Sequence, residues 1–157
     1  MELAHEFSVP VPVEQAWRVL TDVERIAPCL PGAELTGSDG DSYQGQVKVK
    51  VGPITAQYRG TASFTEKDES KHRVVLKADG RDTRGQGTAS ATVTAVMVPD
   101  EGTTAVSIVT DLSITGRVAQ FGRGVMSDVS ARLLDQFVRN LEADVLRVGP
   151  DGAASGG

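Results

Sequence analysis

The sequence predicts an α+β fold, in which a seven-stranded antiparallel sheet wraps around one long C-terminal helix and two short helices follow the first strand. Three observations carry this prediction. A first strand is followed by two short helical segments that end at Pro28 and Pro31. Six more strand candidates then follow with turn residues between them. The globular part ends in a long segment whose apolar residues recur at helical spacing.

The first elements are marked by strand alternation and by prolines. Leu3 to Val9 forms the first strand, and Pro12 starts a short helix that reaches Leu20. Asp22 is expected to cap a second helix, Val23 to Ala27, which the two prolines end. The remaining strand candidates are Ala33–Gly37, Ser42–Val51, Ile54–Thr65, His72–Ala78, Thr88–Val98 and Thr104–Thr115.

The strands alternate between apolar and polar residues, so the sheet has one dry face and one wet face. Val47, Val49 and Val51 alternate with Lys48 and Lys50. The last strand has the same pattern, with Val106, Ile108, Thr110, Leu112 and Ile114 on the dry side. The final helix, about 123–147, is expected to cover this face with a stripe made of Met126, Val129, Leu133, Phe137, Leu141 and Val145.

One strand offers an unusually small dry face. Its inward residues are Ala89, Ala91, Val93 and Ala95, and the whole chain has only seven aromatic residues. Because protein interiors pack to crystal-like density, a long helix over such a floor implies either a close approach of helix and sheet or a cavity. Composition alone leaves both interpretations open.

Length and composition exclude several classes of protein. The 157 residues suit one domain, 1–147, followed by a flexible tail, 148–157, of linker composition. The formal net charge is −5 and the basic residues are scattered, so we expect no nucleic-acid partner. A single cysteine excludes an internal disulfide. We find no secretory signal pattern and no run of about 18 apolar residues that would span a bilayer.

Three sequence blocks resemble a known family. They are CLPGAE at Cys29–Glu34, KVGPITAQYRG at Lys50–Gly60 and GRVAQFGRGVMSDVSARLLDQFVRNL at Gly116–Leu141. With the order of elements, they resemble the CoxG-like family of carbon monoxide dehydrogenase subunits, within the START/Bet v 1-like (SRPBCC) superfamily. The resemblance covers residues 1 to about 146. It implies a helix-grip fold with a hydrophobic tunnel and an association with aerobic molybdenum-containing CO dehydrogenases.

The resemblance leads to a functional hypothesis. We expect a non-catalytic carrier or membrane adaptor that binds an isoprenoid quinone such as menaquinone, without a covalent cofactor, and links a CO dehydrogenase to the respiratory chain. The expected location is cytoplasmic and peripheral to the cytoplasmic membrane, with membrane contact through a C-terminal segment outside these 157 residues. Two alternatives remain. One is a cyclase-like enzyme using Tyr58, Thr110 or Arg84, and the other is a pure protein tether with an unused cavity.

The expected ligand site combines the dry strand faces with the helix and the turns that border them. Its residues are Ile26, Leu30, Val47, Val49, Ile54, Tyr58, Leu76, Ala91, Val93, Leu112, Val118, Phe121, Val125, Met126, Val129 and Leu133. The loop Gly116–Gly124 is chosen as the portal, because glycines flank the apolar Phe121.

Other chemistry-bearing residues receive structural interpretations. Cys29 is interpreted as a small buried residue in a rigid turn. Gly80–Gly87 is interpreted as a hairpin loop, because it joins two strands and opens no helix. His5 and His72 are expected at the surface or at strand edges. No motif supplies a nucleophile, an acid–base pair or a metal-ligand set, so we expect no catalytic residue and no metal site.

Overall fold

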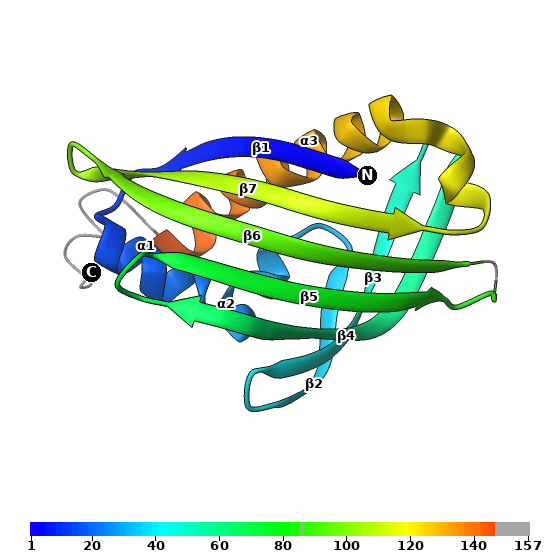
Figure 1. Ribbon diagram of the computed structural model, residues 1–157, viewed down its shortest axis with the longest axis horizontal. Helices are drawn as coiled ribbons and strands as arrows, with labels where there is room; N and C mark the ends of the chain where they lie inside the picture. Colours follow the sequence, from blue (N-terminus) through cyan, green and yellow to red (C-terminus); the bar gives the residue numbers. More distant parts are fainter. Residues whose placement is uncertain (86, 147–157) are drawn as a thin grey trace.

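The computed structural model describes residues 1–85 and 87–146, and the predicted α+β class is confirmed (Figure 1). Within these residues, seven strands form one antiparallel sheet in the order β1-β7-β6-β5-β4-β3-β2. The strands are β1 Glu2–Val9, β2 Ala33–Asp39, β3 Ser42–Val51, β4 Ile54–Asp68, β5 Arg73–Asp82, β6 Thr88–Asp100 and β7 Thr103–Ile114. The predicted tail, 148–157, lies outside the described residues.

The long helix lies along the concave side of the sheet (Figure 1). The helical elements are α1 Val13–Leu20, α2 Val23–Ile26, the 3-10 turns η1 Ala27–Cys29 and η2 Arg117–Phe121, α3 Gly122–Leu141 and the π-helical turn η3 Glu142–Leu146. Helix α3 contacts β1 near one edge of the sheet and β3 near the other. The sheet therefore grips α3 from both sides, and α1 and α2 close one end of the fold.

Local details differ from the predicted boundaries. The second helix ends at Ile26, and Pro28 does not stop the chain from coiling, because η1 continues through Cys29. A proline is tolerated in a first turn, where its missing N–H would have no helical partner. Asp22 occupies the predicted N-cap position of α2, but its side chain makes no capping hydrogen bond. Strands β4 and β5 extend to Asp68 and Asp82, because their pairing continues into the predicted loops.

The predicted faces of the sheet and of α3 are confirmed. Val51 and Val106 are buried on the concave face, whereas Lys48 and Lys50 are exposed. Along α3, Met126, Val129 and Leu141 are buried, and Leu133 and Phe137 are partly buried. The alternation of the strands and the helical period of α3 therefore place the core between sheet and helix.

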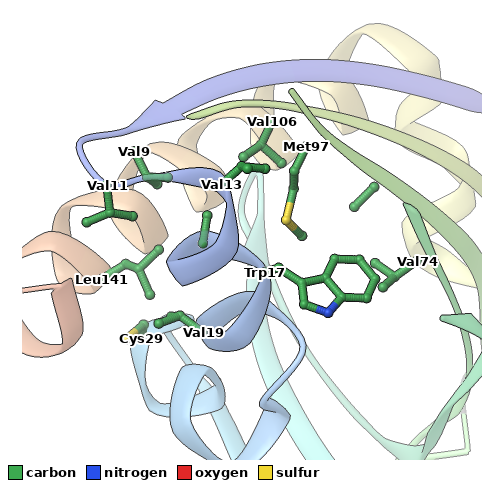
Figure 2. Close-up of a cluster of buried hydrophobic side chains, with 12 residues drawn as sticks. Val9, Val11, Val13, Trp17, Val19, Cys29, Val74, Met97, Val106 and Leu141 are labelled. Atoms are coloured by element: carbon green, nitrogen blue, oxygen red, sulfur yellow. The ribbon is translucent and has the colours of Figure 1, made fainter. Parts of the chain in front are cut away.

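The apolar interior is divided into two clusters at opposite ends of the sheet. We call the first cluster, which includes Trp17, Val74, Met97, Leu141 and Cys29, the packed end. Figure 2 shows Trp17 of α1 between Met97 and Val74. The second cluster joins Leu3, Val51, Ala56, Val118, Met126 and Val129. Between the two clusters the concave face carries much smaller side chains.

Candidate functional site: an apolar cleft over a floor of glycine and alanine

Two cross-strand rows of small residues line a cleft of about 300 Å³. One row runs Gly45–Gly60–Gly80–Ala89 and the other runs Tyr43–Ala62–Ala78–Ala91, each across β3, β4, β5 and β6. We call the seven glycine and alanine residues of these rows the small-residue floor. The exposed lining of the cleft is almost entirely apolar. The sequence left open whether the helix approaches the small residues of the sheet closely or leaves a cavity over them, and the structure has a cavity.

Glycine is required at the centre of the floor because the backbone of the neighbouring strand comes very close. A Cβ atom at Gly60 would lie 1.8 Å from the carbonyl oxygen of Asp79, and one at Gly45 would lie 2.6 Å from that of Glu34. Such a close approach leaves room for a hydrogen atom only. Any larger residue at Gly60 has to push β5 away.

The roof of the cleft is anchored to the long helix. Val23, Ala27 and Leu30 line the cleft from α2, η1 and the residue that follows η1. The side-chain amide of Asn140 on α3 donates a hydrogen bond to the carbonyl oxygen of Cys29, with an N–O distance of 2.8 Å. This bond fixes the turn that presents Leu30 to the cleft.

Cys29 itself is a structural residue. Its side chain is 2% exposed, and burial, with a smaller contribution from Asp144, raises the pKa of the thiol. A buried, protonated thiol is a poor nucleophile. The interpretation of Cys29 as a small buried residue in a turn is confirmed.

Tyr58 stands at the junction of the apolar cleft with a much smaller polar pocket. The polar pocket is also lined by Asp82, which is the cross-strand partner of Tyr58, and by Arg84 and Arg117. Burial, and then repulsion from Asp82, raise the pKa of the Tyr58 phenol. The phenol therefore stays protonated at neutral pH and is a hydrogen-bond donor rather than a base.

A second hollow of about 540 Å³ lies between α3 and β3, and we call it the basic groove. Its lining comprises Pro31, Gly32, Lys48, Val49, Lys50, Gly52, Val129, Arg132 and Leu133. Val47 lines the cleft and Val49, the next residue on the same face of β3, lines the groove. The two hollows are therefore neighbours, and both are open rather than parts of one closed tunnel.

The predicted ligand residues are distributed over these hollows. Leu30, Val47, Tyr58 and Ala91 line the cleft, whereas Val49, Val129 and Leu133 line the basic groove. Ile54 and Val118 line the polar pocket with Tyr58. Seven others line none of the three hollows: Ile26, Leu76, Val93, Leu112, Phe121, Val125 and Met126. Binding by any of them stays a prediction.

Six of the cleft residues that were not in the predicted site belong to the floor. Gly60, Ala62, Ala78 and Gly80 alternate with polar residues, and this period-2 pattern was a signal that could have found them. Conversely, Leu76 and Val93 are too far along their strands, because they belong with Phe64 to the next cross-strand row. Of the polar candidates for catalysis, Tyr58 and Arg84 meet at the polar pocket, whereas Thr110 lines none of the hollows.

The histidines and the predicted portal loop lie in or beside regular elements. His5 lies on edge strand β1, which agrees with the predicted surface or strand-edge position, although its Nε2 atom is buried and has no hydrogen-bond partner. His72 is partly buried against the ring of Trp17, with a centroid separation of 5.8 Å. The segment Gly116–Gly124 is not an open loop, because it forms η2 and the first residues of α3. Gly80–Gly87 includes the end of β5 and the turn to β6, which confirms a hairpin.

The described part of the chain, 1–85 and 87–146, offers neither a cluster of metal ligands nor a membrane-spanning helix. No group of three or more His, Cys, Asp or Glu residues is placed there to hold a metal ion. No helix in that part has the length and apolar character needed to cross a bilayer.

Comparison with known proteins assigns the family. The CoxG family of carbon monoxide dehydrogenase subunits matches residues 6–146. The chain belongs to the CoxG family. A search of the curated proteins found no match.

Solved structures show the fold that this CoxG-family chain shares. A conserved protein from Geobacillus kaustophilus is 17% identical with a TM-score of 0.82, covering 94% of this chain and 96% of that one. The ZhuI aromatase/cyclase from Streptomyces is 14% identical with a TM-score of 0.68, covering 97% and 98%. Norcoclaurine synthase from Thalictrum flavum is 16% identical with a TM-score of 0.60, covering 93% and 86%. These similarities confirm the helix-grip, Bet v 1-like fold.

Proposed function

We propose that this CoxG-family chain is a non-catalytic carrier that binds an isoprenoid quinone, such as menaquinone, in the apolar cleft. It presents the quinone to a molybdenum-containing CO dehydrogenase and so links that enzyme to the respiratory chain at the cytoplasmic side of the membrane. Family membership supports the enzyme partner. The observation that carries ligand binding is the apolar cleft over the small-residue floor.

The size of the cleft indicates which part of the ligand it holds. At about 300 Å³ it lies at the lower end of the range for small-molecule sites. It suits a ring system or a few prenyl units, but not a whole long-chain quinone. Each buried methylene-sized group contributes roughly 0.8 kcal/mol, so a few prenyl units suffice to offset the entropy lost on association. The part of the prenyl tail that does not fit in the cleft can lie against the apolar residues of the adjoining basic groove.

Tyr58 gives the cleft one polar end. Its protonated phenol borders both the cleft and the polar pocket, where it can donate a hydrogen bond to a quinone carbonyl. The same arrangement is the best argument for the cyclase-like alternative, because Arg84 shares the polar pocket. We favour the carrier, since a phenol with a raised pKa is not a base at neutral pH.

Titration with a short-chain menaquinone tests the proposal. We expect saturable one-to-one binding that Ala91→Trp weakens at least tenfold, because an indole placed on the floor fills the cleft. Thr92→Trp is the matched control: residue 92 is the next residue on β6, is exposed and lies on the opposite face of the sheet. Equal binding by wild type and Ala91→Trp, with both folded, would move the ligand site away from the cleft.

The natural ligand and the partner need a second experiment. Native mass spectrometry of protein isolated from its host, before and after organic extraction, should show a prenyl quinone that leaves on extraction. Affinity capture should recover the CO dehydrogenase. Capture of the enzyme by a protein that never holds or binds a lipid would support the pure tether instead, and turnover of a hydrophobic substrate would support the cyclase-like enzyme.

A further inference from the structure

The convex face of the sheet is free of the helices α1, α2 and α3, which lie on the concave side (Figure 1). Strand β6 runs along this convex face, with β5 on one side and β7 on the other. Its outward residues alternate with the buried Ala95 and Met97. They are Thr92, Thr94, Val96 and Val98. No charged residue occurs from residue 88 to residue 98, so an uncharged strip follows β6 across the face.

Charges of opposite sign border this strip on its two sides. The basic outward residues of β5 are Arg73, Lys77 and Arg81, and the acidic outward residues of β7 and β1 are Asp111, Glu2 and Glu6. Neither β7 nor β1 has an outward Lys or Arg. Asp79 is the acidic outward residue of β5, and its carboxylate already accepts a hydrogen bond from the Ser90 hydroxyl. The convex face is therefore mainly basic on one side of β6 and acidic on the other.

The two charges nearest the strip are poorly neutralised within the chain. Lys77 and Asp111 are both exposed. The ion pairs between described residues do not include Lys77. Asp111 has only the amino terminus of Met1, with an N–O distance of 3.9 Å.

The strand register makes this face complementary to itself. Lys77 and Asp111 flank β6 in one cross-strand row, and Val75 and Val109 flank it in the next. A two-fold axis along β6 lays β5 of each copy over β7 of the other. Each row then meets its own reverse. Lys77 lies opposite Asp111 of the second copy, and Val75 lies opposite Val109 of the second copy.

The apolar residues and the curvature of the sheet indicate the size of such a contact. Val98 and Val109, two of the large apolar residues that are exposed among the described ones, both point out from this face. Because the sheet curves around α3, only β5, β6 and β7 can touch a second copy at once. Three strands about 4.8 Å apart give each copy roughly 500 Å² of contact, so a dimer buries about 1,000 Å² in total, at the low end for specific interfaces. The net charge of −5 on each copy adds a repulsion that also keeps the dimer weak.

We propose that the convex face joins two copies of this chain in a reversible dimer whose two-fold axis runs along β6. Two equivalent ion pairs, each between Lys77 of one copy and Asp111 of the other, flank an apolar centre where Val75 meets Val109. The cleft lies on the opposite face of each sheet, so both clefts stay open on the outer sides of the dimer. This contact goes beyond the proposed quinone function and does not depend on it.

Charge reversal combined with analytical ultracentrifugation tests the contact. We expect the wild type to pass from monomer to dimer between micromolar and near-millimolar concentration. Lys77→Glu and Asp111→Lys should each raise the dissociation constant at least about tenfold, because the two-fold axis makes every substitution create two like-charge pairs. An equal mixture of the two variants should dimerise as the wild type does. In that heterodimer, Glu at position 77 of one copy meets Lys at position 111 of the other, and the second pair is the native one.

The matched control is Lys71→Glu, which changes the net charge equally at an exposed residue between β4 and β5. It should dimerise as the wild type does, and equal loss in Lys71→Glu and Lys77→Glu would overturn the proposal. So would a wild type that stays monomeric throughout, or a mixture that fails to dimerise. A monomeric wild type whose capture of CO dehydrogenase is lost in Lys77→Glu would assign the face to that enzyme instead. Loss of quinone titration with intact dimerisation would count against the proposed function alone.

Discussion

The packed end and the small-residue floor lie on the same face of the same strands but have opposite properties. On β6, Ala95 and Met97 are buried beneath Trp17, whereas Ala89 and Ala91 line a cleft. Between them runs the row Phe64–Leu76–Val93, whose bulky side chains separate the two regions. Four residues along β6, from Ala95 to Ala91, are thus enough to pass from core to cavity. The size of the inward side chain, rather than the fold, decides where a ligand has room.

The packed end and the small-residue floor differ in how completely side chains cover the sheet. At the packed end, α1 adds Trp17, which lies between Met97 and Val74 in the buried cluster. Over the floor, only Val23, Ala27 and Leu30 reach down from above. We therefore expect substitutions at the packed end to change stability, and substitutions around the floor to change ligand binding.

The largest expected effect is at the packed end. Trp17→Ala removes an indole that is 8% exposed, and it should lower the free energy of unfolding by about 3–5 kcal/mol. Urea denaturation would measure this. Trp17→Phe should lose clearly less, because a ring still fills most of the space. Under conditions where both variants are folded, quinone affinity should match that of the wild type, and a large loss of affinity would show that the two regions are coupled.

A second prediction concerns Gly60, the floor residue that lies against the backbone of β5. Gly60→Ala places a methyl group against the carbonyl oxygen of Asp79 and should lower the free energy of unfolding by about 1–3 kcal/mol. Ligand affinity should fall as well, because β5 must move. Gly124→Ala is the control: a Cβ there meets nothing within 4 Å, and alanine in the helix should stabilise the protein by up to about 1 kcal/mol. Equal effects of the two variants would contradict the close approach at Gly60.

A third prediction sharpens the description of the cleft. Tyr58→Phe removes one hydroxyl and keeps the ring, so it should weaken quinone binding about tenfold, as expected for a lost hydrogen bond of about 1 kcal/mol or slightly more. Binding of a prenyl hydrocarbon without carbonyl groups should not change. Calorimetric titration of both ligands gives the comparison, and an equal loss for the two would mean that Tyr58 acts through shape alone.

The smallest expected effect concerns pH and Cys29. The folded state raises the pKa of this thiol above its ordinary value of about 8.5, so stability from the buried neutral form is complete below that pH and falls as the pH rises toward the folded-state pKa. Urea denaturation at increasing alkaline pH should show a small decline that Cys29→Ala removes. Tyr58, with its own raised pKa, adds a decline only above about pH 10. An identical pH profile in Cys29→Ala would assign the early decline to another group.

Much of the fold can be predicted because strand and helix periods are local signals. The alternation of Val47, Val49 and Val51 with two lysines predicts the correct faces, and the small inward residues of β6 indicate a cavity as one of two possibilities. Strand ends are less accurate, since the pairing of β4 with β5 continues through residues that have turn composition. The local sequence does not show how far a partner strand extends.

The portal loop and the ligand residues show a second limit of local reasoning. Apolar character predicts Phe121 and Met126 at the ligand; both pack in the second cluster and line none of the three hollows, so ligand contact by them stays a prediction. The sequence also gives no sign that the backbone of Gly32 accepts a hydrogen bond from Lys48 at the edge of β3, or that a groove lies beyond this point. A buried apolar residue has the same sequence pattern whether it faces another side chain or an empty space.

The sequence by itself determined the class of fold, the two faces of the sheet and the row of small residues on β6, because side-chain period and size act within one strand or helix. Tertiary structure decided that four strands align their glycines and alanines into one floor, that Tyr58 faces both the cleft and a polar pocket, and that Lys48 and Lys50 share a groove with Arg132. Each of these depends on strand register or on helix placement. Both are set by packing between residues far apart in the chain, which no local pattern contains.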